Sequence, residues 1–182
     1  MNANAGAPGD TPADTPFWNF SLQFYRQPGV SDSCIALQDG CGVDVNMLLY
    51  LFWCASLGRQ LFAVDVKQLD ERVRGWRELA VIPLRDARRK LKGAATFVSP
   101  PRQEAFRTKI KAVELEAERL QQEALYEAAQ KDLPGVNAEP SAAVRANSAA
   151  YAAALGTTFP DTALAALFAA FDALPSRDRG TA

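Results

Sequence analysis

The chain has 182 residues, 48% of them hydrophobic and 23% charged, with a formal net charge of −1. These values are typical of an ordinary folded domain and exclude a disordered or fibrous chain. Histidine is absent, which excludes Ser-His-Asp and Cys-His nucleophile activation as well as His-ligated zinc.

Cysteine usage and apolar run length exclude further classes. The three cysteines, Cys34, Cys41 and Cys54, form no CxxC pair, so we predict reduced thiols in a cytoplasmic protein and no metal site. The longest apolar run, Met47 to Ala55, is about half of the roughly 20 residues that a membrane-spanning helix needs. We therefore predict no membrane span. No Walker loop or GxGxxG fingerprint occurs, so we also predict no cofactor.

The N-terminal third predicts a tail and three helices. Residues 1–14 are small, polar or turn-forming and predict a disordered tail. Thr15 and Pro16 then begin a helix that ends at Pro28-Gly29. Ser31 and Asp32 are expected to cap a short second helix through Gln38, which ends at Gly40 or Gly42.

The third helix is expected to lie in the centre of the core. Asp44 stands where it begins, as an N-cap, and residues 45–57 are apolar on nearly every side. A helix that is apolar all round but too short to span a membrane needs neighbours on all sides.

The rest of the chain also has helical periods. We predict a helix over 65–79, a short helix that begins at Pro83, a linker over 93–101 and a long helix over about 102–130. After a break, two alanine-rich helices follow, the second capped by Asp161. The predicted fold is all-α: one compact bundle of about six to eight helices, with a core domain over 15–131 and a C-terminal helical extension over 132–182.

Three sequence blocks, WNFSLQFYRQPGV, CIALQDGCGVDVNMLLYLFW and VIPLRDARRKLK, together resemble a family of small, chiefly proteobacterial proteins known only as a domain of unknown function. The most specific part is LQDxxGxDVNxLL, matched by Leu37, Gln38, Asp39, Gly42, Asp44, Val45, Asn46, Leu48 and Leu49. The likeness covers roughly residues 17–130. It implies a helical, cytoplasmic, bacterial protein and supplies no catalytic residues.

Four polar side chains, Gln38, Asp39, Asp44 and Asn46, stand at the entrance to the third helix. In the structural interpretation they end one helix and cap the next. In the alternative, Asp39 and Asp44 converge on a substrate or cation, with Gln38 and Asn46 as orienting amides. We favour the structural interpretation because acidic residues are common at helix starts.

The middle of the chain is strongly basic. Residues 67–111 contain thirteen Lys or Arg against five Asp or Glu, a net of +8. Arg85, Arg88, Arg89 and Lys92 share one face of the helix after Pro83, where they could bind a polyanion such as nucleic acid. The alternative is that this face meets the acidic part of the long helix, within one molecule or across a homodimer.

The long helix carries apolar residues at alternating steps of four and three, a heptad pattern that requires a helical partner. We call this set the seam: Phe106, Ile110, Val113, Ala117, Leu120 and Ala124. It is either buried against the protein's own helices, which we favour, or open to a partner.

These patterns together favour a non-catalytic helical protein that binds an as yet unknown protein. Binding of nucleic acid or ribosomes through the Arg85–Lys92 face is the first alternative. A carboxylate-based enzyme centred on Asp39 and Asp44 is the second.

Overall fold

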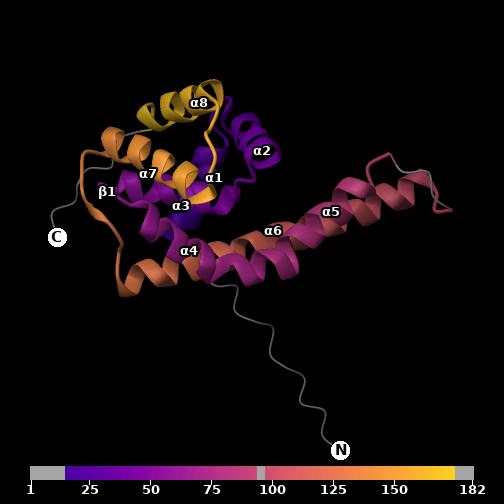
Figure 1. Ribbon diagram of the computed structural model, residues 1–182. Helices are drawn as coiled ribbons and strands as arrows, with labels where there is room; N and C mark the ends of the chain where they lie inside the picture. Colours follow the sequence, from indigo (N-terminus) through magenta and orange to yellow (C-terminus); the bar gives the residue numbers. More distant parts are fainter. Residues whose placement is uncertain (1–14, 94–96, 175–182) are drawn as a thin grey trace, which may run out of the picture.

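The computed structural model describes residues 15–93 and 97–174 (Figure 1). The predicted tail over 1–14 and three residues of the predicted linker lie outside this part of the chain. The all-α prediction is confirmed. The elements are α1 (Pro16–Tyr25), α2 (Val30–Cys41), α3 (Val45–Ser56), β1 (Arg59–Gln60), α4 (Ala63–Trp76), the π-helical turn η1 (Arg77–Val81), α5 (Ile82–Lys90), α6 (Pro100–Lys131), β2 (Val136–Asn137), α7 (Pro140–Leu155) and α8 (Asp161–Asp172).

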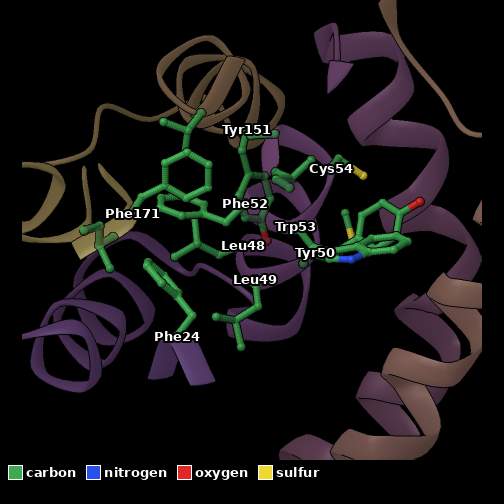
Figure 2. Close-up of a cluster of buried hydrophobic side chains, with 14 of the residues drawn as sticks. Phe24, Leu48, Leu49, Tyr50, Phe52, Trp53, Cys54, Tyr151 and Phe171 are labelled. Carbon is green, nitrogen blue, oxygen red and sulfur yellow. The ribbon is translucent and has the colours of Figure 1, made fainter. Parts of the chain in front are cut away.

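Helix α3 is the centre of the hydrophobic core, as its sequence predicts. Every residue from Asn46 to Ala55 is buried, and α3 contacts α1, α2, α6 and α7. Its aromatic residues meet those of other helices: Phe52 packs against Phe24 and Phe171 (Figure 2). Trp53 packs against Phe17 of α1. These rings provide much of the apolar area that is removed from water on folding.

The caps of the first helices agree with the sequence in part. Thr15 Oγ1 accepts a hydrogen bond from Trp18 N at 3.0 Å, as predicted. The predicted capping of α2 by Ser31 and Asp32 is wrong, because the helix begins at Val30, directly after the left-handed Gly29 (φ 78°). Since Val30 is fully buried, an earlier start places it in the core and moves the two polar residues into the first turn. The helix ends at Gly42 (φ 69°).

Helices α4 and α5 are continuous, contrary to the predicted break before Pro83. The turn η1 joins them, and Ile82 N donates to Arg77 O, five residues back. Proline has no N–H to donate and its ring clashes with the carbonyl four residues earlier in a regular α-helix. A wider π-turn directly before Pro83 accommodates both effects, so the chain passes the proline without ending the helix.

Helix α5 and the N-terminal half of α6 form a hairpin that extends away from the other helices (Figure 1). We call this hairpin, residues 77–92 and 100–118, the arm. Helix α6 begins at Pro100, slightly before its predicted start, because Pro100 and Pro101 take the first two helical positions, where no N–H is needed.

The C-terminal helices pack into the same core as the rest of the protein. Val144, Tyr151, Leu167 and Phe171 are buried members of one cluster with the residues of α1 and α3. Asn147, fully buried on α7, donates to Leu51 O and Arg59 O at 3.0 and 3.1 Å. Asp161 is the first residue of α8 and not its N-cap, which is Pro160.

Candidate functional site: a buried polar layer and an exposed seam

Asp44 is the N-cap of α3 and the centre of a buried polar layer. Its Oδ1 accepts from Asn46 N at 2.9 Å, and its Oδ2 accepts from Arg77 Nη1 at 2.9 Å and from Gln121 Nε2. Its own N–H donates to Tyr151 Oη at 2.9 Å. The residue is only 6% exposed. Its carboxylate is therefore fully occupied by donors from α3, η1 and α6.

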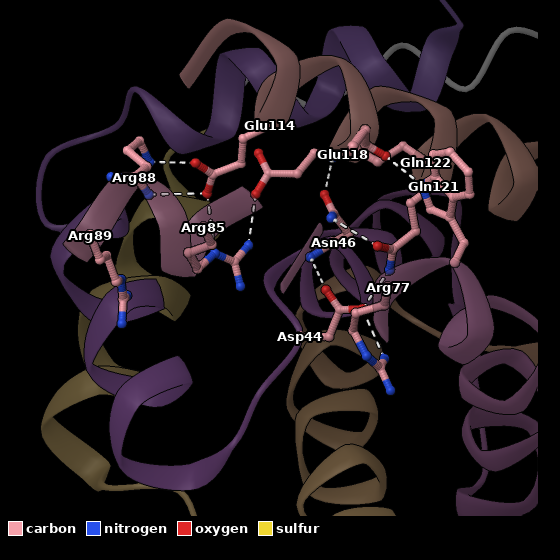
Figure 3. A network of polar contacts seen from close by, with 12 residues as sticks. Asp44, Asn46, Arg77, Arg85, Arg88, Arg89, Glu114, Glu118, Gln121 and Gln122 are labelled. Carbon is pink, nitrogen blue, oxygen red and sulfur yellow. Dashed lines mark hydrogen bonds and ion pairs between the residues drawn. The ribbon is translucent and has the colours of Figure 1, made fainter. Parts of the chain in front are cut away.

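Asn46, Gln121 and Gln122 continue the layer across the contact between α3 and α6 (Figure 3). Asn46 Nδ2 donates to Gln121 Oε1 at 3.4 Å, and Gln122 Nε2 donates to Asn46 Oδ1 at 2.8 Å. All three side chains are buried. The amides therefore connect the two helices by hydrogen bonds, and Gln122 Oε1 is buried without a hydrogen-bond partner.

Arg77 joins this layer to α4. It donates to Asp70 Oδ1 at 2.6 Å as well as to Asp44. Burial alone would raise the pKa of Asp70, but the hydrogen bonds from Arg77 and Arg74 outweigh burial and lower it. Four members of the layer are not among the site residues predicted from the sequence: Arg77, Asp70, Gln121 and Tyr151. The adjacent amides Gln121-Gln122, in a helix otherwise rich in charge, are the sequence signal that points to the α6 side of the layer.

Asp39 has a different partner from Asp44. It lies near the end of α2 with its side chain 51% exposed, and it accepts from Arg89 Nη1 and Nη2, both at 3.0 Å. The hydrogen bond from Arg89 lowers the pKa of Asp39. Each of the two carboxylates is thus neutralised by its own arginine, and Gln38 is half-buried on α2 beside Asp39.

Arg85 and Arg88 face the acidic part of α6. Arg85 Nη2 donates to Glu118 Oε1 at 2.7 Å, and Arg88 Nη2 and Nε donate to the two oxygens of Glu114. Glu114 is buried. With Arg89 on Asp39, three of the four proposed polyanion-binding residues bind carboxylates of this chain, and Lys92 is exposed near the tip of the arm. This arrangement matches the alternative in which the basic face meets the acidic helix.

The seam does not pack inside the protein, so the favoured internal role is wrong. Phe106, Val113 and Leu120 are 56%, 55% and 40% exposed, Ile110 is half-buried, and only Ala117 of the six is buried. The buried side of α6 carries Glu114, Gln121, Gln122, Leu125 and Ala129 along with Ala117. The prediction from apolar spacing was wrong because half of the buried residues of α6 are polar.

The family model described as "Protein of unknown function (DUF2390)" matches residues 16–125, more than half of the chain. The chain belongs to this family. The family match contains the LQDxxGxDVNxLL block, the polar layer up to Gln122 and the whole arm. Neither a curated protein nor a solved structure matches the chain.

One small hollow lies beside the polar layer in this family member. Its volume is about 260 Å³, and its lining is Lys67, Asp70, Glu71, Arg74, Tyr151, Ala154 and Leu155. The two cations and two anions of α4 offset one another there, so the hollow has no uniform charge for an ionic ligand. Among the described residues no group of three or more Cys, Asp or Glu side chains is placed to hold a metal ion, and no helix is long and apolar enough to cross a membrane.

The cysteines in the described part of the chain are thiols. Burial raises the pKa of both Cys34 and Cys54 to about 12. Cys41 is half-buried at the end of α2, and its Sγ lies 3.8 Å from Thr158 O. Cys34 and Cys54 therefore act as small buried apolar side chains rather than as nucleophiles.

Proposed function

We propose that this protein is a non-catalytic interaction module that binds a protein partner through the seam of α6. The observation that carries the proposal is the exposure of Phe106, Val113 and Leu120 in heptad register on a helix that extends from the body. Apolar residues at this spacing form a stripe that packs well against a second helix. A contiguous exposed apolar stripe is typical of an interaction site.

The chemistry of the polar layer supports a role other than catalysis. A general acid or base must reach a substrate, and its pKa is usually shifted toward neutrality. Asp44 is buried under Arg77 and Gln121, whereas the pKa of exposed Asp39 is lowered by Arg89. We therefore assign both residues to structure. The proposal includes a cytoplasmic location, supported by the thiol state of Cys34, Cys41 and Cys54.

The proposal is tested by quantitative co-purification from cells of the native host, with a tagged chain as bait and nuclease treatment in a parallel sample. We expect at least one protein, which can be an untagged copy of this chain, to co-purify with the wild type irrespective of nuclease. Val113→Glu places a charge in the middle of the seam and is expected to reduce that capture at least about tenfold.

Thr108→Glu is the matched control, because Thr108 is an exposed residue of the same helix on the side away from the seam. It introduces the same charge and should leave capture unchanged. Equal capture by the wild type, Val113→Glu and Thr108→Glu would contradict the proposal. Capture that disappears with nuclease would favour the nucleic-acid alternative.

A further inference from the structure

We propose that the partner of the seam is a second copy of this chain, with the two α6 helices packed antiparallel about a two-fold axis. This inference rests on the proposed function, since it names the occupant of the same surface. Three features of α6 support it: its charge distribution, the register that its seam allows, and the shape of the surface beside the seam.

Charge is divided along α6 in a way that suits antiparallel self-association. Its first part carries Arg102, Arg107, Lys109 and Lys111 against Glu104, whereas its second part carries Glu114, Glu116, Glu118, Glu123 and Glu127 against Arg119 and Lys131. Two parallel copies would place like charges opposite one another. Two antiparallel copies place the basic part of each helix against the acidic part of the other, which favours one orientation and one partner.

The heptad spacing fixes a register in which these charges pair. When Ile110 lies opposite Val113 of the second copy, Phe106 lies opposite Ala117 of the second copy. A large ring then meets a small side chain, as close helix packing requires. In the same register Lys109 lies beside Glu116 of the second copy, and Arg102 lies beside Glu123 of the second copy. The two-fold axis repeats every pair.

The edge of the seam that carries these charges faces solvent. Arg102, Lys109 and Glu116 are exposed, and Glu123 is half-buried. Glu116 and Glu123 bind Arg119 within the helix, at exposed or partly exposed positions where a second cation can approach. This edge of α6 points away from α5, whose arginines Arg85 and Arg88 occupy the inner face. A second helix can therefore lie along the seam without displacing α5.

Trp76 extends the apolar surface on the inner edge of the seam. Its Nε1 donates to Ala117 O at 2.9 Å, so the indole lies beside the seam with its polar group satisfied, and the residue is 39% exposed. From Phe106 to Leu120 the seam is about 21 Å long, given a rise of 1.5 Å per residue. That length gives an interface at the small end of specific ones, so we expect a reversible dimer.

The test is the mass in solution as a function of protein concentration, measured by sedimentation or by light scattering on the full chain. The monomer is 19.7 kDa, and the wild type should approach twice this mass as concentration rises. Lys109→Glu and Glu116→Lys each turn two attractive contacts into repulsive ones. Each is expected to raise the dimer dissociation constant about tenfold.

The double variant Lys109→Glu with Glu116→Lys restores opposite charges across the interface and should recover most of the lost affinity. Within one helix the two positions are seven residues apart, so the recovery cannot come from a direct contact inside one molecule. Thr108→Glu again serves as the charge control and should dimerise as the wild type does.

A wild type that stays monomeric at high micromolar concentration overturns the inference. So does a dimer that the charge reversals leave unchanged, or a double variant no better than the single ones. If the chain is monomeric, but the wild type captures a different protein that Val113→Glu does not capture, this inference fails while the proposed function stands. If the seam variants alter neither dimerisation nor capture, both fail.

Discussion

Asp44 shows how one side chain can begin a helix and also join separate parts of the fold. Its carboxylate caps α3, binds the guanidinium of Arg77 and accepts from Gln121, while its N–H reaches Tyr151 on α7. Although burial alone would lower the pKa of Arg77, the carboxylates of Asp70 and Asp44 raise it. A buried charge without a partner costs several kcal/mol, so the members of such a layer depend on one another.

We expect Asp44→Ala to lower the free energy of unfolding by about 3 kcal/mol, from the loss of a helix cap and of one partner of buried Arg77. Asp39→Ala is the comparison, because it also removes an aspartate bound to arginine but at an exposed site. It should cost under about 1 kcal/mol. Urea unfolding measures both, and equal losses would contradict the role given to the polar layer.

At the scale of elements, α6 carries two different apolar patterns on neighbouring sides. The inner side packs Leu125 and Ala129 into the core and sets Glu114 against the arginines of α5. The outer side carries the seam. Helix α6 is 32 residues long, and its two ends have different neighbours. Its C-terminal end packs into the hydrophobic core, whereas its N-terminal end forms part of the arm.

Two leucines of α6 separate these roles. Leu125 is fully buried, whereas Leu120 is 40% exposed. We expect Leu125→Ala to lower the free energy of unfolding of the monomer by about 2–5 kcal/mol through the cavity that it leaves. Leu120→Ala should change it by no more than about 0.5 kcal/mol. Chemical denaturation at low protein concentration measures the free energy of unfolding of both variants. A larger loss from Leu120→Ala would indicate that the seam packs inside the protein after all.

The helical pattern could be predicted from the sequence where apolar residues and caps act locally. Asp44 before a continuous apolar run was enough to place α3 and its central position. Contacts between distant residues could not be predicted in this way. Arg77 contacts Asp44 across 33 residues of sequence, and the π-turn that it begins carries the helix past Pro83, where a proline normally signals a break.

The inner face of α6 was missed for a related reason. A buried helix face is predicted from the spacing of its apolar residues. Glu114, Gln121 and Gln122 are polar and are buried because they bind polar partners on α3 and α5. The seam, which has the better apolar pattern, lies about a quarter turn away and stays outside. The heptad pattern thus identified a continuous apolar surface of α6, but this surface faces solvent and not the core.

At the scale of the whole molecule, contacts between segments bring together charges that the sequence keeps apart. The basic residues 67–111 carry a net charge of +8 between two acidic flanks. Arg89 binds Asp39, Arg77 binds Asp44, and Arg85 and Arg88 bind Glu114. The middle of the chain is therefore paired with acids from both sides, and protonation of those acids should loosen the fold as a unit.

Asp70, an acid within the basic segment itself, shows the sign of the pH dependence that pairing with arginine produces. Its pKa is lowered in the folded state, so its contribution to stability is fully present above its ordinary pKa, about 3.9, and is lost as pH falls through the lower folded value. We expect Asp70→Asn to lower the free energy of unfolding by about 2 kcal/mol at neutral pH. The difference from the wild type should shrink as the pH falls below that ordinary value and through the lower folded pKa of Asp70. Urea unfolding across that range measures it, and a constant difference would contradict the assignment.

The hydrogen bond from the Asp44 N–H to Tyr151 matters for the choice of where to truncate this protein for expression. The family match stops at residue 125, but Tyr151 and Asn147 complete the backbone pairing of residues 44, 51, 59 and 61 and are buried in the core. A fragment cut at the border of the match would expose these groups and the rings around them. Expression boundaries are better drawn beyond Leu174, so that all of α7 and α8 are retained.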